Sequence, residues 1–157
     1  MRNIVLARVD DRLIHGEVVT AWTPSLSANR IVIVDDQVAA DNFNRRVLMA
    51  LAPQGTKVAV LSVEGATKAL LKPDPGNERV IVLTKTPIVF EQLVDGGVEI
   101  KEVCLGGIRG DRKPFVNNVS ASPAEVDSIR RMKNEKGVHV YYQLVPEQKV
   151  VDISNLL

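Results

Sequence analysis

The stretch RVDDRLIHGEV, residues 8–18, places groups that could do acid–base or group-transfer chemistry within a few positions of one another. The chain has two histidines, and one of them, His15, lies here. A cation, Arg12, and two carboxylates, Asp10 and Asp11, stand shortly before it. Because a short apolar run precedes the stretch and a segment of helical character follows it, these groups are predicted to lie at a strand-to-helix junction.

Such a junction favours phosphate chemistry. In an open parallel sheet, ligands collect where the strands end, and helix-start amides together with the helix dipole favour bound anions there. The same field disfavours an imidazolium, so it keeps His15 neutral at about pH 7 and therefore nucleophilic. If His15 attacks a phosphoryl group, the amides and Arg12 can hold the phosphate. Gly16 lets the backbone approach the phosphate oxygens closely.

The other residues of the loop have more than one possible role. Asp10 or Asp11 could accept a hydrogen bond from the second ring nitrogen of His15 and fix its tautomer, or could pair with Arg12. The same residues also fit a loop histidine without catalytic role beside capping carboxylates, and spacing alone does not decide. The remaining residues of the predicted phosphate loop are Leu13, Ile14, Gly16 and Glu17.

Two further loops carry candidate groups for the same crevice. One reads GGIRG, residues 106–110, and either forms an anion-binding nest whose arginine reaches the phosphate or a partner, or is an ordinary turn. The other is a pair of aspartates after an apolar run, which either lines the crevice or caps the next helix. The residues concerned are Asp35, Asp36, Gly106, Gly107 and Arg109.

The composition limits the class of protein. At 157 residues, 45% of them hydrophobic, residues 1–157 are predicted to form one domain with a single sizeable core. Twenty basic and nineteen acidic residues leave a net charge of +1, which argues against binding nucleic acid or anionic lipid. One cysteine excludes an internal disulfide and gives no cysteine pair for structural zinc, and no apolar run has signal or membrane-spanning length, so we expect a cytoplasmic protein without membrane insertion. No G-x-G-x-x-G, Walker A or G-x-S-x-G pattern occurs, so no cofactor is predicted.

Apolar runs rich in β-branched residues recur about every 25 residues, which is the length of one βα unit. They are continuous rather than alternating, as is typical of parallel strands covered on both faces. These predicted strands are Ile4–Ala7, Ile31–Val34, Val58–Leu61 and Val80–Leu83.

Helix signals follow each run. Residues 41–51 carry an apolar stripe at three- and four-residue spacing, and serine, threonine and proline mark the starts of later helices. The stripe comprises Phe43, Val47, Leu48 and Leu51. The predicted N-terminal caps are Ser62, Thr86 with Pro87, and Ser122 with Glu125. Gly137 stands where the C-terminus of the last helix is expected.

Residues 138–144 alternate apolar and polar side chains, so this last strand is predicted to lie at a sheet edge or to bury only one face. Alternating strands and helices favour the α/β class. We therefore expect an open three-layer sandwich, in which helices cover both faces of a mainly parallel sheet with an edge strand near the C-terminus.

At RVDDRLIHGEV the sequence resembles the enzyme IIB components of the mannose/fructose/sorbose family of the bacterial phosphoenolpyruvate-dependent sugar phosphotransferase system (PTS). Those proteins carry a closely similar stretch that contains the phosphorylated histidine. The likeness continues in the same order through further segments and covers nearly the whole chain. These segments are residues 34–41, VDDQVAAD; 52–55, APQG; 93–100, LVDGGVEI; 105–107, LGG; and 116–120, VNNVS.

The resemblance implies the open, mainly parallel fold expected above and a role as a phosphocarrier. By its match to the family histidine, His15 would accept a phosphoryl group at Nδ1 from a phosphohistidine on a IIA domain. It would then phosphorylate the sugar that enters through the membrane partners IIC and IID, which would hold the protein at the inner face of the membrane. Arg12 is implied as the residue that neutralises the phosphate, without a metal or cofactor.

The sequence also departs from the family. Glu17 stands where the family usually has glutamine, and it places a carboxylate beside a site that must accept a doubly negative group. This residue either weakens phosphorylation or only complements the helix start and points to solvent. Thr23 and Pro24 predict a first helix that is short or kinked. Trp22 is predicted to be a core or interface residue, or a platform for sugar stacking.

Two other functions stay open. In the first, the chain is a non-catalytic docking or regulatory module of the same fold, because Glu17 prevents efficient phosphorylation. In the second, it is an α/β enzyme that acts on a phosphorylated small molecule with His15 as general base.

Overall fold

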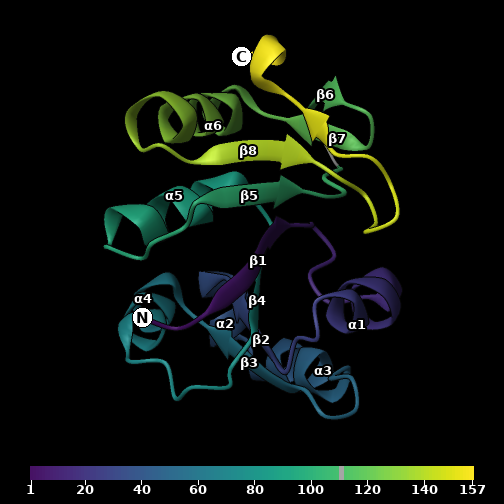
Figure 1. Ribbon diagram of the computed structural model, residues 1–157, viewed down its shortest axis with the longest axis vertical. Helices are drawn as coiled ribbons and strands as arrows, with labels where there is room; N and C mark the ends of the chain where they lie inside the picture. The colour runs from purple at the N-terminus through teal and green to yellow at the C-terminus, as the bar shows by residue number, and fades with distance from the viewer. Residues whose placement is uncertain (110–111) are drawn as a thin grey trace.

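The computed structural model describes residues 1–109 and 112–157. Its centre is a seven-stranded sheet in the order β3-β2-β4-β1-β5-β8-β9, which Figure 1 shows from β8 near the top to β3 near the bottom. The neighbouring pairs from β3 to β8 are parallel, and β9 runs antiparallel to β8. The strands are β1 (Ile4–Val9), β2 (Arg30–Val34), β3 (Lys57–Leu61), β4 (Val80–Thr84), β5 (Glu102–Leu105), β8 (His139–Tyr142) and β9 (Val151–Asp152).

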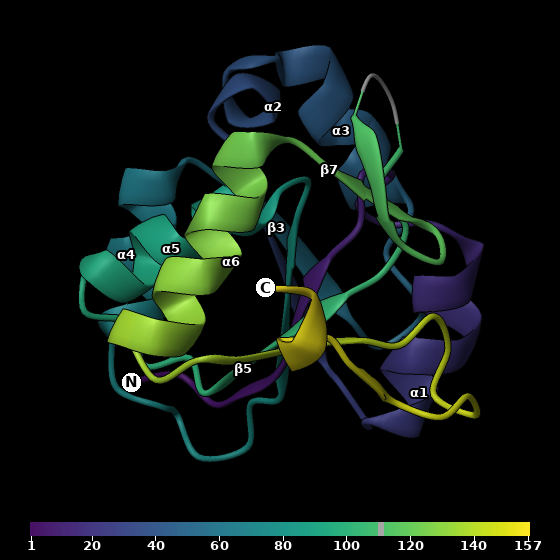
Figure 2. The same ribbon diagram turned by 90° about the horizontal axis from the view of Figure 1, so that it is seen from above.

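The strands bury alternate side chains in two cores, one on each face of the sheet. In β2, Val32 and Val34 enter one core, while Ile31 and Ile33 enter the other. Side chains of α4, α5 and α6 complete the first core, and η1, α2 and α3 contribute to the second. Figure 2 shows α4, α5 and α6 grouped on one side and α1 on the other. The helical segments are η1 (Val18–Trp22), α1 (Thr23–Ser25), α2 (Asp36–Ala40), α3 (Asn42–Ala50), α4 (Val63–Leu71), α5 (Pro87–Asp95), α6 (Pro123–Glu135) and η2 (Ser154–Leu156).

This arrangement confirms the predicted open three-layer α/β sandwich with a mainly parallel sheet. The four predicted strands are present as β1 to β4. The predicted caps are also present: the side chains of Ser62 and Thr86 accept hydrogen bonds from the first turns of α4 and α5. At α6, Ser122 and Glu125 form the reciprocal capping box. Gly137, beyond the end of α6, has φ = 65°, a left-handed conformation that favours glycine.

The first helical segment is irregular, as Pro24 predicts. Helical backbone begins at Gly16, and residues 18–22 form a π-helical turn. The backbone N–H of Thr23 and its hydroxyl both donate to the carbonyl of Val18, five residues earlier. Because proline has no N–H to continue the normal ladder, the wide turn directly before it accommodates the break.

The stripe expected on residues 41–51 differs from its prediction. Helix α3 forms, but Phe43 is 75% exposed, and Val47 and Leu51 are also exposed. Leu48 is the stripe residue that packs against the second core. The reason is position: α3 contacts α2 and β3, and β3 is an edge strand, so only one side of the helix reaches the sheet.

The C-terminal third also holds elements that the sequence did not predict. A hairpin of β6 (Lys113–Val116) and β7 (Val119–Ala121) precedes α6, and Asn117 in its turn has φ = 37°. The strand expected within residues 138–144 is β8, which is not an edge strand, because β9 pairs with it and forms the edge. It does bury one face, since Val140 and Tyr142 are buried while His139 is exposed.

Candidate functional site

The loop after β1 is held by the two strands that flank β1. The backbone N–H of Asp10 donates to the carbonyl of Thr84 at the end of β4, and that of Asp11 donates to Gly107 after β5, both at 2.9 Å. The chain then turns at Leu13, whose φ of 59° is unusual for a residue with a side chain. The loop is thus fixed at the carboxyl edge of the sheet, where parallel sheets bind their ligands.

Leu13 and Ile14 attach this loop to the core of the protein. Both side chains are buried in the second core, and they do not line the surface beside His15. Their place in the predicted phosphate loop is therefore that of packing residues. Gly16, by contrast, is exposed and begins the helical segment directly after His15.

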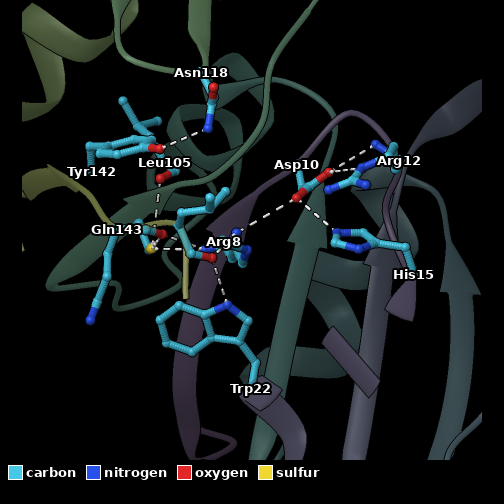
Figure 3. A network of polar contacts seen from close by, with 11 residues as sticks. Arg8, Asp10, Arg12, His15, Trp22, Leu105, Asn118, Tyr142 and Gln143 are labelled. Atoms are coloured by element: carbon cyan, nitrogen blue, oxygen red, sulfur yellow. Dashed lines mark hydrogen bonds and ion pairs between the residues drawn. The ribbon is translucent and has the colours of Figure 1, made fainter. Parts of the chain in front are cut away.

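Asp10, rather than Asp11, contacts the histidine. The Oδ2 atom of Asp10 lies 2.9 Å from Nε2 of His15 (Figure 3), and the Asp10 side chain is completely buried while that of His15 is 12% exposed. An ionised carboxylate can only accept a hydrogen bond, so Nε2 carries a proton, and in the neutral ring Nδ1 then keeps its lone pair. Within the described part of the chain, no hydrogen bond joins Nδ1 to a protein group.

The ionised state of Asp10 is favoured by its surroundings. Burial raises the pKa of this carboxyl, but hydrogen bonds from His15 and from the backbone N–H of Arg12, with the charge of Arg8 and that of the His15 ring when it is protonated, outweigh burial. The net result is a pKa below its ordinary value. Asp10 is therefore an acceptor throughout the neutral range.

Arg12 lies on the same side of Asp10 as the histidine (Figure 3). Its Nε is 3.5 Å from Oδ1 of Asp10, and its side chain is 43% exposed. An ion pair this exposed and this long contributes little to stability. The guanidinium therefore keeps donors that can meet an anion arriving from solvent.

Asp11 has a different partner. Its Oδ2 accepts a 2.7 Å hydrogen bond from the backbone N–H of Arg109, which ties the β1 loop to the loop after β5. Gly106 and Gly107 are buried in that second loop, and Arg109 is exposed. Since Asp11 already occupies the Arg109 N–H, the geometry favours a structural turn over an anion-binding nest. Gly110, the last residue of the predicted nest, lies outside the described residues.

Asp35 and Asp36 are used as caps and lie away from the histidine. Asp35 accepts from the N–H of Val38 at 2.9 Å and caps α2, while Asp36 accepts from the N–H of Val63 at 2.8 Å at the start of α4. Their strand, β2, is separated from β1 by β4. Of the two roles that the sequence allows, the geometry supports capping.

Glu17 and Trp22 also take definite places. One carboxylate oxygen of Glu17 is buried without a hydrogen-bond partner among residues 1–109 and 112–157, so the side chain does not simply point to solvent. It makes no capping hydrogen bond at the helix start. Trp22 is 4% exposed, and its indole N–H donates to the carbonyl of Leu144 at 3.2 Å. It is a core residue rather than a platform for sugar.

Arg8 is the site residue that the sequence analysis missed. It is completely buried, and its Nη2 lies 3.6 Å from Oδ2 of Asp10, the oxygen that faces His15. The sequence did contain a signal for this role, because Leu6 and Arg8 are two residues apart in a buried strand and therefore lie on the same face. A cation on such a face needs a partner, and Asp10 follows two residues later.

Neither a metal cluster nor a membrane span is found in the part of the chain that the structure describes. No group of three or more histidine, cysteine, aspartate or glutamate side chains there could hold a metal ion. The helices of that same part are all too short or too polar to cross a bilayer.

Comparison with known proteins places this geometry in a family. Residues 4–157 match the family described as PTS system sorbose subfamily IIB component. The chain is 31% identical to the fructose-specific EIIB component of Bacillus subtilis, over 100% of this chain and 97% of that protein. It is 36% identical to the mannose-specific EIIAB component of Escherichia coli K12 over 96% of its own length, but spans only about half, 48%, of that relative.

A solved structure agrees with the sequence comparison. The IIB domain of the sorbose permease from Klebsiella pneumoniae superposes with a TM-score of 0.90 and 35% sequence identity, covering 98% of this chain and 94% of that one. Family match, relatives and fold therefore agree, and the chain belongs to the sorbose-subfamily IIB components of the phosphotransferase system.

Proposed function

We propose that this chain is a phosphocarrier in which His15 accepts a phosphoryl group and passes it to a sugar. The observation that carries the proposal is the Asp10–His15 contact. With Nε2 donating to a buried carboxylate, Nδ1 holds the free lone pair that nucleophilic attack requires. The ring lies directly before the helical backbone that starts at Gly16, where backbone amides and the helix dipole favour a phosphate.

Two transfers make up the proposed cycle. In the first, a bond forms between Nδ1 of His15 and phosphorus as the N–P bond of a donor phosphohistidine breaks, and the donor imidazole leaves. In the second, the N–P bond on His15 breaks as a sugar hydroxyl bonds to phosphorus and releases its proton to solvent, and Nδ1 leaves with its lone pair restored. Asp10 keeps the ring oriented throughout by accepting from Nε2, and it stays ionised.

Arg12 and the helix start supply positive potential for the transferred group. The exposed guanidinium of Arg12 can neutralise part of the phosphate charge without a metal ion. Gly16 leaves the approach open, because a side chain built at this position would meet no protein atom within 4 Å. The partner or sugar can therefore come close to the ring.

Family membership supports a proposal for the partners. The donor is a IIA domain, which agrees with the name of a relative, an EIIAB component of which this chain matches about half. The acceptor sugar arrives through membrane subunits IIC and IID. We place residues 1–157, as one IIB domain, in the cytoplasm at the inner face of the membrane, where these partners would hold it.

Intact-mass measurement tests the proposal. The protein is incubated with phosphoenolpyruvate, enzyme I, HPr and a cognate IIA, in parallel with His15→Ala. We expect a gain of one phosphoryl group that is acid-labile and base-stable, and no gain in His15→Ala. If IIA is phosphorylated and binds the chain but no group is transferred, the carrier role is contradicted.

The buried oxygen of Glu17 gives a reason to consider the docking or regulatory module as a second candidate function. A carboxylate two residues from His15 raises the cost of placing a dianion there. The variant Glu17→Gln separates the two functions. A chain that is phosphorylated only as Glu17→Gln would be a docking module in its natural form, whereas similar rates in both show that Glu17 is tolerated.

A further inference from the structure

A buried cation lies behind the Asp10–His15 pair. Arg8 is the fifth residue of β1, and its side chain enters the face of the sheet that carries the second core. It is 0% exposed, a rare state for an arginine unless it is paired. The burial of this residue requires an explanation in terms of what its charge does.

The guanidinium makes directed contacts on several sides. Nη1 donates to the carbonyl of Gln143 at 2.8 Å, and Nη2 donates to that of Leu144 at 2.9 Å. The Cζ atom lies 4.9 Å from the centre of the Trp22 ring. These contacts fix the group in the place from which Nη2 faces Asp10, as Figure 3 shows.

Gly106 makes room for this cation. A Cβ atom built on Gly106 would lie 2.4 Å from Nη2 and 2.6 Å from Cζ of Arg8. The same construction on Gly107 meets no atom within 4 Å. An added methyl group would therefore meet Arg8 at position 106 and no protein atom within 4 Å at the neighbouring position 107.

The charge of Arg8 is balanced by Asp10 within the described part of the chain. The other titratable groups that face the pair are Arg12 and His15 from the loop, Cys104 from β5 and Tyr141 from β8. Burial raises the pKa of both the Cys104 thiol and the Tyr141 phenol, so neither is an anion at neutral pH. Asp10 is the carboxylate among these groups, and Arg8 is the fully buried cation beside it.

We propose that Arg8 is a positioning residue that fixes the tautomer of His15 by holding Asp10 as a carboxylate. Without the charge of Arg8, the burial that favours the neutral carboxyl would be opposed by the hydrogen bonds from His15 and from the backbone N–H of Arg12, and we expect Asp10 to take up a proton. Its O–H would then donate to Nε2, and the ring proton would move to Nδ1. The nitrogen proposed to attack phosphorus would lose its lone pair. The link to phosphoryl transfer rests on the proposed function, but the link to the tautomer does not.

The test is ¹⁵N NMR of the His15 ring nitrogens in the unphosphorylated protein, at a pH where the ring is neutral. In the natural protein we expect a protonated Nε2 and an unprotonated Nδ1. In Arg8→Gln, which removes the charge but keeps an amide donor, we expect the proton to move largely to Nδ1. Arg8→Lys keeps a cation at this position, so its His15 ring is expected to have the same tautomer as the natural protein.

The glycine pair provides a matched control that leaves Arg8 in the chain. Gly106→Ala displaces the guanidinium and is expected to shift the tautomer in the same direction as Arg8→Gln, whereas Gly107→Ala is expected to leave it unchanged. This pair also carries the test if Arg8→Gln does not fold. A natural tautomer in Gly106→Ala, or in folded Arg8→Gln, overturns the inference.

Phosphorylation is measured separately on the same variants. If Arg8 acts through the tautomer, Arg8→Gln should accept phosphate roughly 10²-fold more slowly or worse, since a wrong histidine tautomer has effects of that order or larger in Ser-His-Asp enzymes. An altered tautomer with a natural rate contradicts the proposed role of Nδ1. If the natural protein is never phosphorylated but Arg8→Gln still has the altered tautomer, the result supports the role of Arg8 in fixing the tautomer and contradicts the proposed phosphocarrier function.

Discussion

Two nearly buried carboxylates, Asp10 and Glu91, are surrounded by hydrogen-bond donors, yet their surroundings produce different outcomes. The side chain of Asp10 is 0% exposed and that of Glu91 is 7% exposed. Glu91 accepts from Arg131 through two nitrogens, from Lys136 and from Ser128, each at 2.8 Å. Asp10 accepts from His15 and from a backbone N–H and faces Arg8.

The difference lies in the donors. Arg131 and Lys136 stay protonated, and the hydrogen bonds from Arg131 are the largest cause that lowers the pKa of Glu91 to about 2. Their contacts hold α5 to α6 and leave no reactive atom. His15 has a second nitrogen and can change its proton position, so a similar buried carboxylate creates a potential nucleophile. Hydrogen bonds from fixed cations stabilise the packing of α5 against α6, whereas pairing with a histidine prepares the chemistry that we propose for His15.

The largest effect is expected from Asp10→Asn, which removes the carboxylate that pairs with the histidine. The amide would donate to Nε2 and favour the wrong tautomer, so phosphoryl acceptance should fall by roughly 10²-fold or more. The charge of Arg8 would also lose its partner, and the free energy of unfolding should fall by about 3 kcal/mol. Rates are measured on protein shown to be folded by circular dichroism. An unchanged rate would remove Asp10 from the mechanism.

Glu91→Gln changes the other carboxylate and should affect stability alone. The free energy of unfolding is expected to fall by about 1–3 kcal/mol at neutral pH, because hydrogen bonds to charged groups are lost. A pKa of about 2, below the ordinary 4.5, gives stability that is present above pH 4.5 and is lost as the pH falls toward 2. Urea unfolding should therefore show the natural protein and Glu91→Gln converging over this range. Phosphoryl acceptance should stay unchanged, and a slower rate would show coupling between the two regions.

The smallest effect is expected on α3, which lies outside both regions. Phe43→Ser should change the free energy of unfolding by less than about 0.5 kcal/mol, because this side chain is 75% exposed. Leu48→Ala, on the inner side of the same helix, should cost about 1 kcal/mol or more. Thermal unfolding of both variants checks the assignment. Equal losses would mean that Phe43 is covered in solution.

The strands and most helix starts could be predicted because their signals are local. Continuous apolar runs identify buried parallel strands, and residues such as Ser62 and Thr86 satisfy amides within their own turn. The stripe of α3 was misleading because periodicity defines a face but not what covers it. Whether Phe43 meets a core depends on α3 lying over the edge strand β3, which is a tertiary fact.

The candidate site was partly predictable for a similar reason. His15 and Arg12 stand out by residue type and by resemblance, and their placement at a strand-to-helix junction was expected. The choice between Asp10 and Asp11 could not be made, because it depends on which side chain turns inward beside β5. The spacing of Arg8 and Asp10 is a local signal for a paired cation, but the carbonyls of Gln143 and Leu144 that hold Arg8 in place lie more than a hundred residues away, and no local pattern indicates them.

The contacts of Arg8 with the segment after β8 also bear on how the protein is made. Its hydrogen bonds join residues separated by 135 and 136 positions, nearly the full length of the chain. During synthesis β1 leaves the ribosome before these carbonyls do, so Arg8 lacks these two hydrogen-bond acceptors until the segment after β8 has been made. Contacts of such long range form late, so the histidine loop should acquire its final geometry only in the last stage of folding.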